Sequence, residues 1–134
     1  MFGYITINME KIMVYETKMR PLMEHVGKNG YLTNKGIMSI LETVACYQSE
    51  EAGYGVTSID KNGVSWVQLD WKIKVIKRPK FPDELNIKTW GRDSTKIATY
   101  RDYEMYDENN NLCVIATTKW VLVDVITKKI ARIT

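Results

Sequence analysis

The sequence predicts one α+β domain in which an antiparallel β-sheet is wrapped around a single central helix. Three observations predict it. One segment has strong helical periodicity, several long segments alternate between apolar and polar residues, and short turn-forming segments separate them. A chain of 134 residues is long enough for one domain with its own core, so we expect a single domain over residues 1–134. An α+β roll of another kind is the main structural alternative.

The helix is expected from Asn34 to Ala52. Its apolar residues follow the i, i+3, i+4, i+7 spacing of a buried helix face, at Ile37, Ile40, Leu41 and Val44. Thr33 or Asn34 can cap its N-terminus, and Gly53 can end it. The apolar surface is widened by Met38, Ala45 and Tyr47. We therefore expect the sheet to wrap the helix rather than cover one side of it.

The clearest strand is expected from Val64 to Ile76. Every second residue there is apolar, which predicts one buried face made of Val67, Leu69, Trp71, Ile73 and Val75. Residues 77–84 contain Pro79 and Pro82 and are expected to form a loop. The segment DENNN is a strong turn signal between two long strands. The other strands are expected at Met13 to Arg20, Leu85 to Trp90, Lys96 to Tyr106 and Leu112 to Val123, with a short segment at Ile126 to Ile133.

Charge and hydropathy exclude several classes of protein. The net charge of +3 is too small to indicate nucleic-acid binding. No apolar run approaches the roughly 20 residues that cross a membrane. The first residues lack the apolar stretch and the cleavage site of a signal peptide. We therefore expect a cytoplasmic protein that binds neither membrane nor nucleic acid.

The side chains most often used for nucleophilic or metal chemistry are few. Cys46 and Cys113 have no CxxC spacing and no nearby histidine, so two packed, reduced thiols are expected and no metal site. The single histidine, His25, precedes a Gly-Lys-Asn-Gly turn, a place typical of a surface residue. A catalytic cysteine or a serine triad would each need this same histidine.

Five segments carry a resemblance to a known family. They are SILETVACYQS, WVQLDWKIKVIKRP, ELNIKTW, RDYEMYD and ATTKWVLVDVITKKIARIT. In order and spacing they resemble the N-terminal hotdog half of plant and bacterial fatty acyl-ACP thioesterases, from about Tyr15 to Thr134. A hotdog is an antiparallel sheet wrapped around one helix, which agrees with the pattern above. The resemblance implies hydrolysis of fatty acyl-ACP or acyl-CoA thioesters without a metal or redox cofactor.

The family normally carries two hotdogs in one chain, and its catalytic groups lie in the second, in a pattern like D-x-N-x-H followed by a helix that contains ILE. Around NGYLTNKGIMSILETV, Asn29 matches the motif asparagine, and Glu42 matches the helix glutamate if one residue is deleted between them. Tyr31 stands where the motif has histidine, and Gly27 where it has aspartate. A single hotdog resembles half of such a unit, so the resemblance implies a homodimer with sites at its interface.

These matches imply a set of candidate site residues. Glu42 is the candidate general base toward water, and burial would help it by raising its pKa. Free N–H groups at the helix N-terminus, near Asn34, would hold the developing oxyanion, with Gly36 allowing close approach of a ligand. Asn29 would orient the water or the carbonyl. The alternative for each is structural: a solvated glutamate, and asparagines that serve the turn and the helix cap.

The densest basic cluster is Lys72, Lys74, Lys77, Arg78 and Lys80. Acyl carrier protein is acidic, so Lys74 and Arg78 are the candidates for steering or binding the substrate. The alternative is a solvated strand face. Two other functions stay open: a catalytically silent hotdog that binds acyl groups and pairs with a catalytic partner, and a hydratase or dehydratase, although the usual Asp/His pair is missing.

Overall fold

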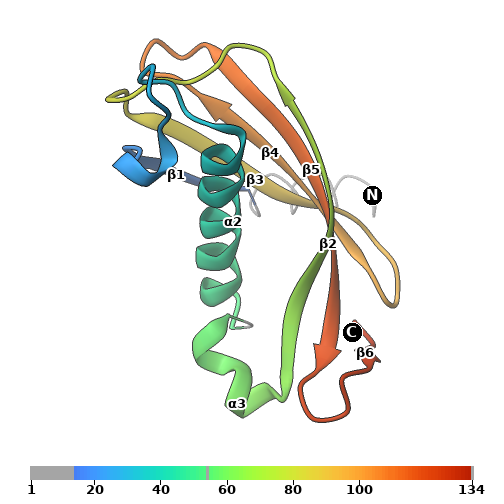
Figure 1. Cartoon of the computed structure of the whole chain (residues 1–134). Coiled ribbons are helices and arrows are strands. Elements are labelled where there is room, and N and C mark those ends of the chain that lie inside the picture. The colour runs from blue at the N-terminus through green and yellow to red at the C-terminus, as the bar shows by residue number, and fades with distance from the viewer. Residues whose placement is uncertain (1–13, 54, 134) are drawn as a thin grey trace.

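A computed structural model describes residues 14–53 and 55–133. Its main elements are the long helix α2 and a curved sheet that bends around one side of it (Figure 1). The sheet strands are β1 (Tyr15–Met19), β2 (Val64–Val75), β3 (Leu85–Ser94), β4 (Thr99–Tyr106), β5 (Leu112–Asp124) and β6 (Ile130–Ala131). The helices are η1 (Met23–His25), α2 (Asn34–Glu51), η2 (Val56–Ser58) and α3 (Ile59–Asn62). The α+β prediction is therefore confirmed.

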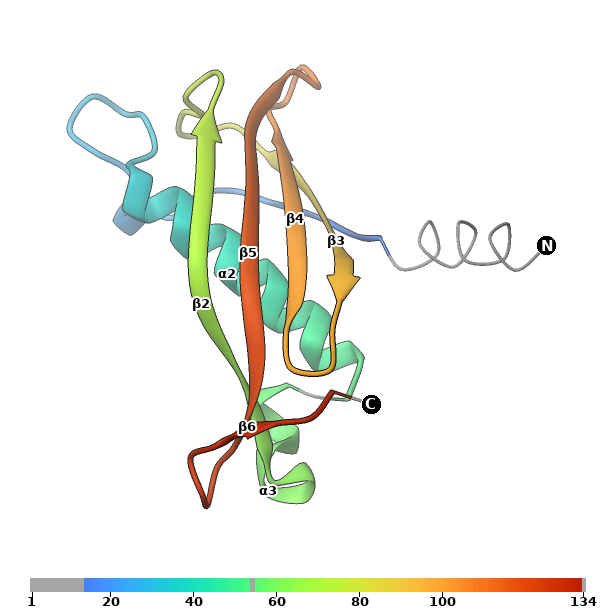
Figure 2. The ribbon, with the colours of Figure 1, turned by 90° about the vertical axis from the view of Figure 1, so that its right-hand side faces the viewer.

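All strand pairs in the described part of the chain are antiparallel. The order across the sheet is β1-β3-β4-β5-β2, and β6 pairs with the end of β5. Figure 2 shows β2, β5, β4 and β3 side by side, with α2 on the far side of them. The path ends at β1 and β2, so the 12-residue strand β2 is an edge strand over most of its length.

Helix α2 begins and ends as the sequence predicts. Thr33 caps it by accepting a hydrogen bond on its side chain from the Gly36 N–H at 2.9 Å, and Gly53 follows the helix with φ of +85°. The buried face consists of Gly36, Ile37, Ile40, Leu41, Val44 and Ala45. The sheet does not wrap the helix fully, because Tyr47 remains 63% exposed and Cys46 is exposed.

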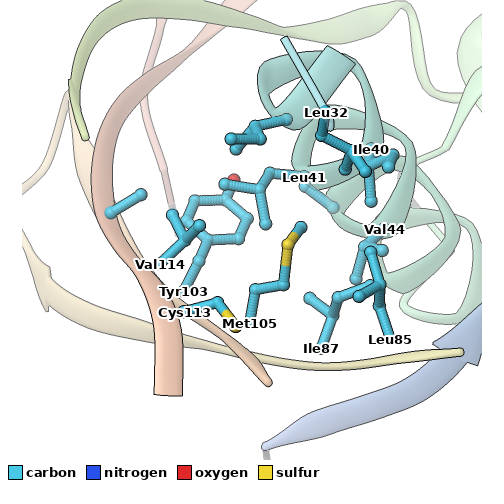
Figure 3. Close-up of a cluster of buried hydrophobic side chains, with 13 residues drawn as sticks. Leu32, Ile40, Leu41, Val44, Leu85, Ile87, Tyr103, Met105, Cys113 and Val114 are labelled. Atoms are coloured by element: carbon cyan, nitrogen blue, oxygen red, sulfur yellow. The ribbon is translucent and has the colours of Figure 1, made fainter. Parts of the chain in front are cut away.

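The core lies between this helix face and the concave face of the sheet. Figure 3 shows Ile40, Leu41 and Val44 from α2 meeting side chains from the strands, among them Leu85, Ile87 and Met105. The inward positions of β3 and β4 alternate, as expected for strands with one buried face. Fully burying an aliphatic side chain contributes about 1.5–3 kcal/mol, so this layer dominates the stability of the fold.

Strand β2 departs from the predicted alternation. A β-bulge at Leu69 shifts the register between Gln68 and Asp70. The bulge adds one residue, so the residues before it face the opposite way from the prediction. Val67 and Leu69 are 41% and 51% exposed, whereas Trp71 packs against the core as predicted.

The other boundaries differ by a few residues. β3 continues to Ser94 and β4 begins only at Thr99, because the turn lies at residues 95–98, where Ala98 N–H donates to Thr95 Oγ1 at 3.0 Å. The C-terminal segment forms only the two-residue strand β6. Met13, predicted to start the first strand, lies outside the described residues. The short helices η1, η2 and α3 were not predicted.

The DENNN segment forms the predicted turn between β4 and β5. The Asp107 carboxylate accepts hydrogen bonds from the N–H groups of Asn109 and Asn111, both at 2.9 Å, and pairs with Lys77 at 3.1 Å. Hydrogen bonds from Asn111, together with Lys77, lower the Asp107 pKa to about 2. A buried carboxylate with these partners fixes the turn, as an Asx-type turn does.

Candidate active site

The N-terminus of α2 presents unpaired backbone donors. The Gly36 N–H is occupied by the Thr33 side chain at 2.9 Å. Among the described residues, no acceptor bonds the N–H groups of Asn34 and Lys35. The first N–H groups of a helix have no partner within the helix, and the helix dipole places partial positive charge there. These two N–H groups can therefore hold a negatively charged oxygen.

Arg78 is fixed beside this helix terminus. Its Nη1 donates to the Leu32 carbonyl oxygen at 2.9 Å, and its Nη2 donates to Asn34 Oδ1 at 2.9 Å. The guanidinium therefore ties the loop after β2 to the start of α2, and it adds a positive charge to the donors of Asn34. The structure thus brings two predicted substrate-binding residues, Asn34 and Arg78, into direct contact.

Gly36 was expected to lie against a bound ligand, but it packs against the backbone of His25. A Cβ at this position would lie 2.2 Å from the carbonyl oxygen of His25, so the glycine allows η1 to pack on α2. The space expected for a ligand is thus filled by the chain itself. His25 is only 6% exposed, and its Nδ1 accepts a hydrogen bond from the Leu22 N–H at 2.9 Å. The expectation of a surface histidine is wrong, because this imidazole helps to hold η1 in place.

Asn29 and Glu42, the two predicted catalytic residues, are separated along the axis of α2. Asn29 is exposed in the turn before α2, where its Oδ1 accepts a hydrogen bond from the Tyr31 N–H at 3.1 Å. Glu42 lies on the exposed face of α2, eight residues after Asn34. At 1.5 Å of rise per residue this is roughly 12 Å along the helix axis. The Glu42 side chain is exposed to solvent rather than buried in a pocket. It lines a shallow hollow of about 300 Å³ together with Thr43, Cys46, Tyr47, Glu50 and Val56.

The two cysteines do not form a nucleophilic site. Cys113 is buried as predicted, but Cys46 is exposed, contrary to the expectation of two packed thiols. Desolvation and the Glu42 carboxylate raise the pKa of Cys46, which keeps this thiol protonated. A protonated thiol is a poor nucleophile, so the carboxylate of Glu42 remains the more suitable reactive group on this face.

The predicted basic cluster is divided between different places. Lys72 and Lys74 point outward from β2, on the sheet face opposite α2, whereas Lys77 is paired with Asp107. A groove of about 550 Å³ on this outer face is lined by Lys72, Lys74, Trp90 and Ile115, among others. The structure therefore does not bring Lys74 to the helix terminus where Arg78 lies.

A further cavity, of about 340 Å³, was not predicted from the sequence. It lies between the C-terminal half of α2 and the sheet, and Arg101 is one of the residues that line it. Burial lowers the pKa of Arg101. The signal was present in the sequence: Arg101 occupies the same alternating face of its strand as the buried Tyr103 and Met105.

The described residues contain no cluster of three or more histidine, cysteine, aspartate or glutamate side chains suited to a metal ion. Within the same residues, α2 and the shorter helices are not long and apolar enough to cross a membrane.

Comparison with protein families gives one match that spans most of the chain. Residues 12–134 match the model of the acyl-ACP thioesterase N-terminal domain. Among curated proteins, the chain is 28% identical over 133 residues to oleoyl-acyl carrier protein thioesterase 2, chloroplastic, of Arabidopsis thaliana. That alignment covers 94% of this chain and 36% of the plant protein, so the chain spans about a third of the length of the relative it matches.

Solved structures share the fold. An acyl-ACP thioesterase from Bacteroides thetaiotaomicron superposes with a TM-score of 0.82 at 20% identity, over 91% of this chain and 50% of that one. A DHNA-CoA thioesterase from Staphylococcus aureus gives a TM-score of 0.80 at 18% identity, over 89% of this chain and 80% of that one. The predicted hotdog architecture is thereby confirmed.

Proposed function

Because this chain belongs to the family of the acyl-ACP thioesterase N-terminal domain, we propose that it hydrolyses the thioester bond of fatty acyl-ACP or acyl-CoA. The observation that carries the proposal is the start of α2. There the N–H groups of Asn34 and Lys35 have no partner among the described residues, and the guanidinium of Arg78 is held beside them by hydrogen bonds to Leu32 and Asn34. Such donors stabilise the oxyanion that forms when a thioester carbonyl is attacked.

In the proposed reaction, water attacks the thioester carbonyl carbon while the Glu42 carboxylate takes one proton from it. The carbonyl oxygen becomes an oxyanion held by the N–H groups of Asn34 and Lys35. The tetrahedral intermediate then collapses, the carbon–sulfur bond breaks, and the proton returns from Glu42 to the leaving sulfur. The products are a free carboxylic acid and the carrier thiol, and Asn29 positions the water.

One protomer cannot supply this whole site. The helix terminus and Glu42 lie roughly 12 Å apart on the same helix, whereas the attacking water and the oxyanion belong to one carbon atom. Two α2 helices that run antiparallel, side by side, bring Glu42 of one copy toward the N-terminus of the other. We therefore propose a homodimer with two composite sites, each built from both copies.

The edge strand β2 is the proposed contact between the copies. It exposes backbone groups that no strand within residues 14–53 and 55–133 pairs, together with the side chains of Val67 and Leu69. A two-fold axis at this edge joins the sheets and places both α2 helices on the same face. The hollow beside Glu42, with the exposed side chains of Tyr47 and Val56, then faces the partner.

A mixing experiment tests the composite site. We expect Asn29→Ala and Glu42→Gln each to be nearly inactive alone. After co-refolding at equal amounts, activity should return to about a quarter of wild type, since half of the dimers are mixed and each has one intact site of two. No recovery, although native mass spectrometry shows mixed dimers, would contradict sites shared between copies. A monomer at micromolar concentration by analytical ultracentrifugation would contradict the dimer itself.

The carrier is recognised, in this proposal, by charge on the outer face of the sheet. Lys72 and Lys74 stand beside Trp90 and Ile115 in the outer groove and would steer an acidic carrier protein toward the dimer. Lys74 is thus assigned to the docking of the carrier, and Arg78 to the thioester. Charge steering of this kind weakens as salt rises.

The proposed function is tested by a hydrolysis assay. Release of free thiol is followed with acyl-ACP and acyl-CoA over a range of chain lengths, using the purified chain. Turnover well above the uncatalysed rate is expected for at least one chain length. If all thioesters bind without turnover, the chain is the silent acyl-binding subunit instead.

A further inference from the structure

The cavity beneath the C-terminal half of α2 is built from both layers of the fold. Gln48 and Ser49 come from the helix, Arg101 from β4, and two aromatic walls, Trp66 and Trp120, from β2 and β5. Its volume is about 340 Å³. At about 30 Å³ for a group the size of water, this gives room for roughly ten non-hydrogen atoms.

Arg101 is the unusual group in this cavity. Its Nη1 donates to Thr89 Oγ1 at 3.2 Å and its Nη2 donates to Gln48 Oε1 at 2.8 Å. Both acceptors are neutral. Among residues 14–53 and 55–133, no carboxylate oxygen lies within 4.0 Å of the guanidinium, whereas the neighbouring Arg92 pairs with both Asp93 and Asp102. The Arg92–Asp93 pair also lines the cavity, but its charges balance each other. Removing a charge from water without a counter-charge is costly, and Arg101 is the cation of this cavity that no contacting carboxylate compensates.

Arg101 also has more N–H donors than there are acceptors bonded to it. A guanidinium has five N–H donors in a fixed fork that fits a carboxylate in a bidentate manner. Each of the two terminal nitrogens donates one N–H group, to Thr89 and to Gln48, and the remaining N–H groups of the fork stay available. The ligand that balances both the charge and the donors is a carboxylate, and the aromatic walls suit an attached apolar chain.

We infer that this cavity binds an aliphatic carboxylate of about ten non-hydrogen atoms, with its charged end on Arg101. The carboxylate could belong to a free fatty acid or to the far end of a dicarboxylic acyl chain. Only the second source rests on the proposed thioesterase function. In that case the substrate would be an acyl thioester whose chain carries a terminal carboxyl group.

A purely structural role for Arg101 makes a different prediction. If the guanidinium only ties Gln48 of α2 to Thr89 of β3, its loss should lower the melting temperature and affect all ligands equally. If it is a ligand-binding charge, Arg101→Met should remove the cost of the buried cation. The melting temperature should then stay within a few degrees of wild type.

The binding experiment uses octanoate and its neutral analogue octanamide, each with ten non-hydrogen atoms, titrated into the full chain by isothermal calorimetry. We expect octanoate to bind at least about tenfold more tightly than octanamide. Arg101→Met should abolish this preference, and Arg101→Lys should retain part of it. Lys61→Met, which removes an exposed positive charge elsewhere, should leave it unchanged.

The binding results test the carboxylate site independently of the proposed thioesterase function. Equal affinity for octanoate and octanamide, or a preference that survives in Arg101→Met, overturns the site, whatever the enzyme hydrolyses. A charge-dependent preference supports it even if no thioester is turned over. Where turnover is seen, faster hydrolysis of suberyl-CoA than of octanoyl-CoA identifies the dicarboxylic acyl chain. The reverse order, with inhibition by octanoate, identifies the free fatty acid.

Discussion

Glu42→Gln is expected to lower kcat for thioester hydrolysis by about 10² to 10⁴, because it removes the general base and changes almost nothing else. The Glu42 side chain is exposed on α2, so its amide analogue should not disturb the fold. Stopped-flow or steady-state thiol release measures the effect. Binding of a non-hydrolysable acyl analogue should survive, since the helix terminus and the cavity are untouched.

The matched control is Glu51→Gln, at the exposed C-terminal end of the same helix. It makes the same chemical change about 13 Å farther along the axis and should leave kcat within a factor of two. If the wild type is active and Glu42→Gln equals it, Glu42 is not the base. Asn29 and the buried His25 then become the next residues to substitute.

The largest effect on stability is expected for Gly36→Ala. The new Cβ would lie 2.2 Å from the His25 carbonyl oxygen and 2.8 Å from two further backbone atoms of that residue. Rigid backbone cannot yield as a flexible side chain can, so η1 and the start of α2 must move apart. We expect a loss of about 3 kcal/mol, the upper end of overpacking costs, measured by urea denaturation. The shift of the helix terminus should also lower kcat.

Gly91→Ala is the matched control for this change. A Cβ at Gly91 meets no atom within 4 Å, and the residue lies inside strand β3. Alanine restricts the unfolded chain more than glycine does, so the free energy of unfolding of Gly91→Ala should equal that of the wild type or be slightly higher. If Gly36→Ala were as stable as Gly91→Ala, the close packing of η1 on α2 would not be essential to the fold.

Periodicity was sufficient to predict the helix and the sheet. The spacing of Ile37, Ile40, Leu41 and Val44 gave the correct buried face, and Thr33 and Gly53 gave the correct ends. The alternation of apolar and polar residues in a sequence cannot reveal a β-bulge. The apolar residues of β2 alternate regularly through the bulge, although the bulge turns those before it to the opposite face of the sheet. For this reason Val67 and Leu69 were predicted to be buried and are exposed.

The candidate site was only partly predictable. The family resemblance selected the start of α2, where Asn34 and Arg78 do meet at 2.9 Å although 44 residues separate them. It could not show that Gly36 is packed against His25, since close approach of two backbone segments depends on tertiary structure. Nor could it show that Lys74 and Arg78 lie apart. Lys74 points to the outer face of the sheet, whereas the loop after β2 carries Arg78 to the start of α2, and the sequence pattern of the strand does not determine the path of that loop.

The bulge at Leu69 makes the length of β2 a determinant of the ligand cavity. Trp66 reaches the cavity wall only because one extra residue separates it from the part of the strand that faces the core. A chain of this family lacking that residue would turn Trp66 to the outside and present Val67 inward. A deletion or insertion of one residue in β2 therefore changes which side chains line the cavity, and with them the ligands that fit. A comparison of the residue types at the cavity positions alone would not reveal such a change.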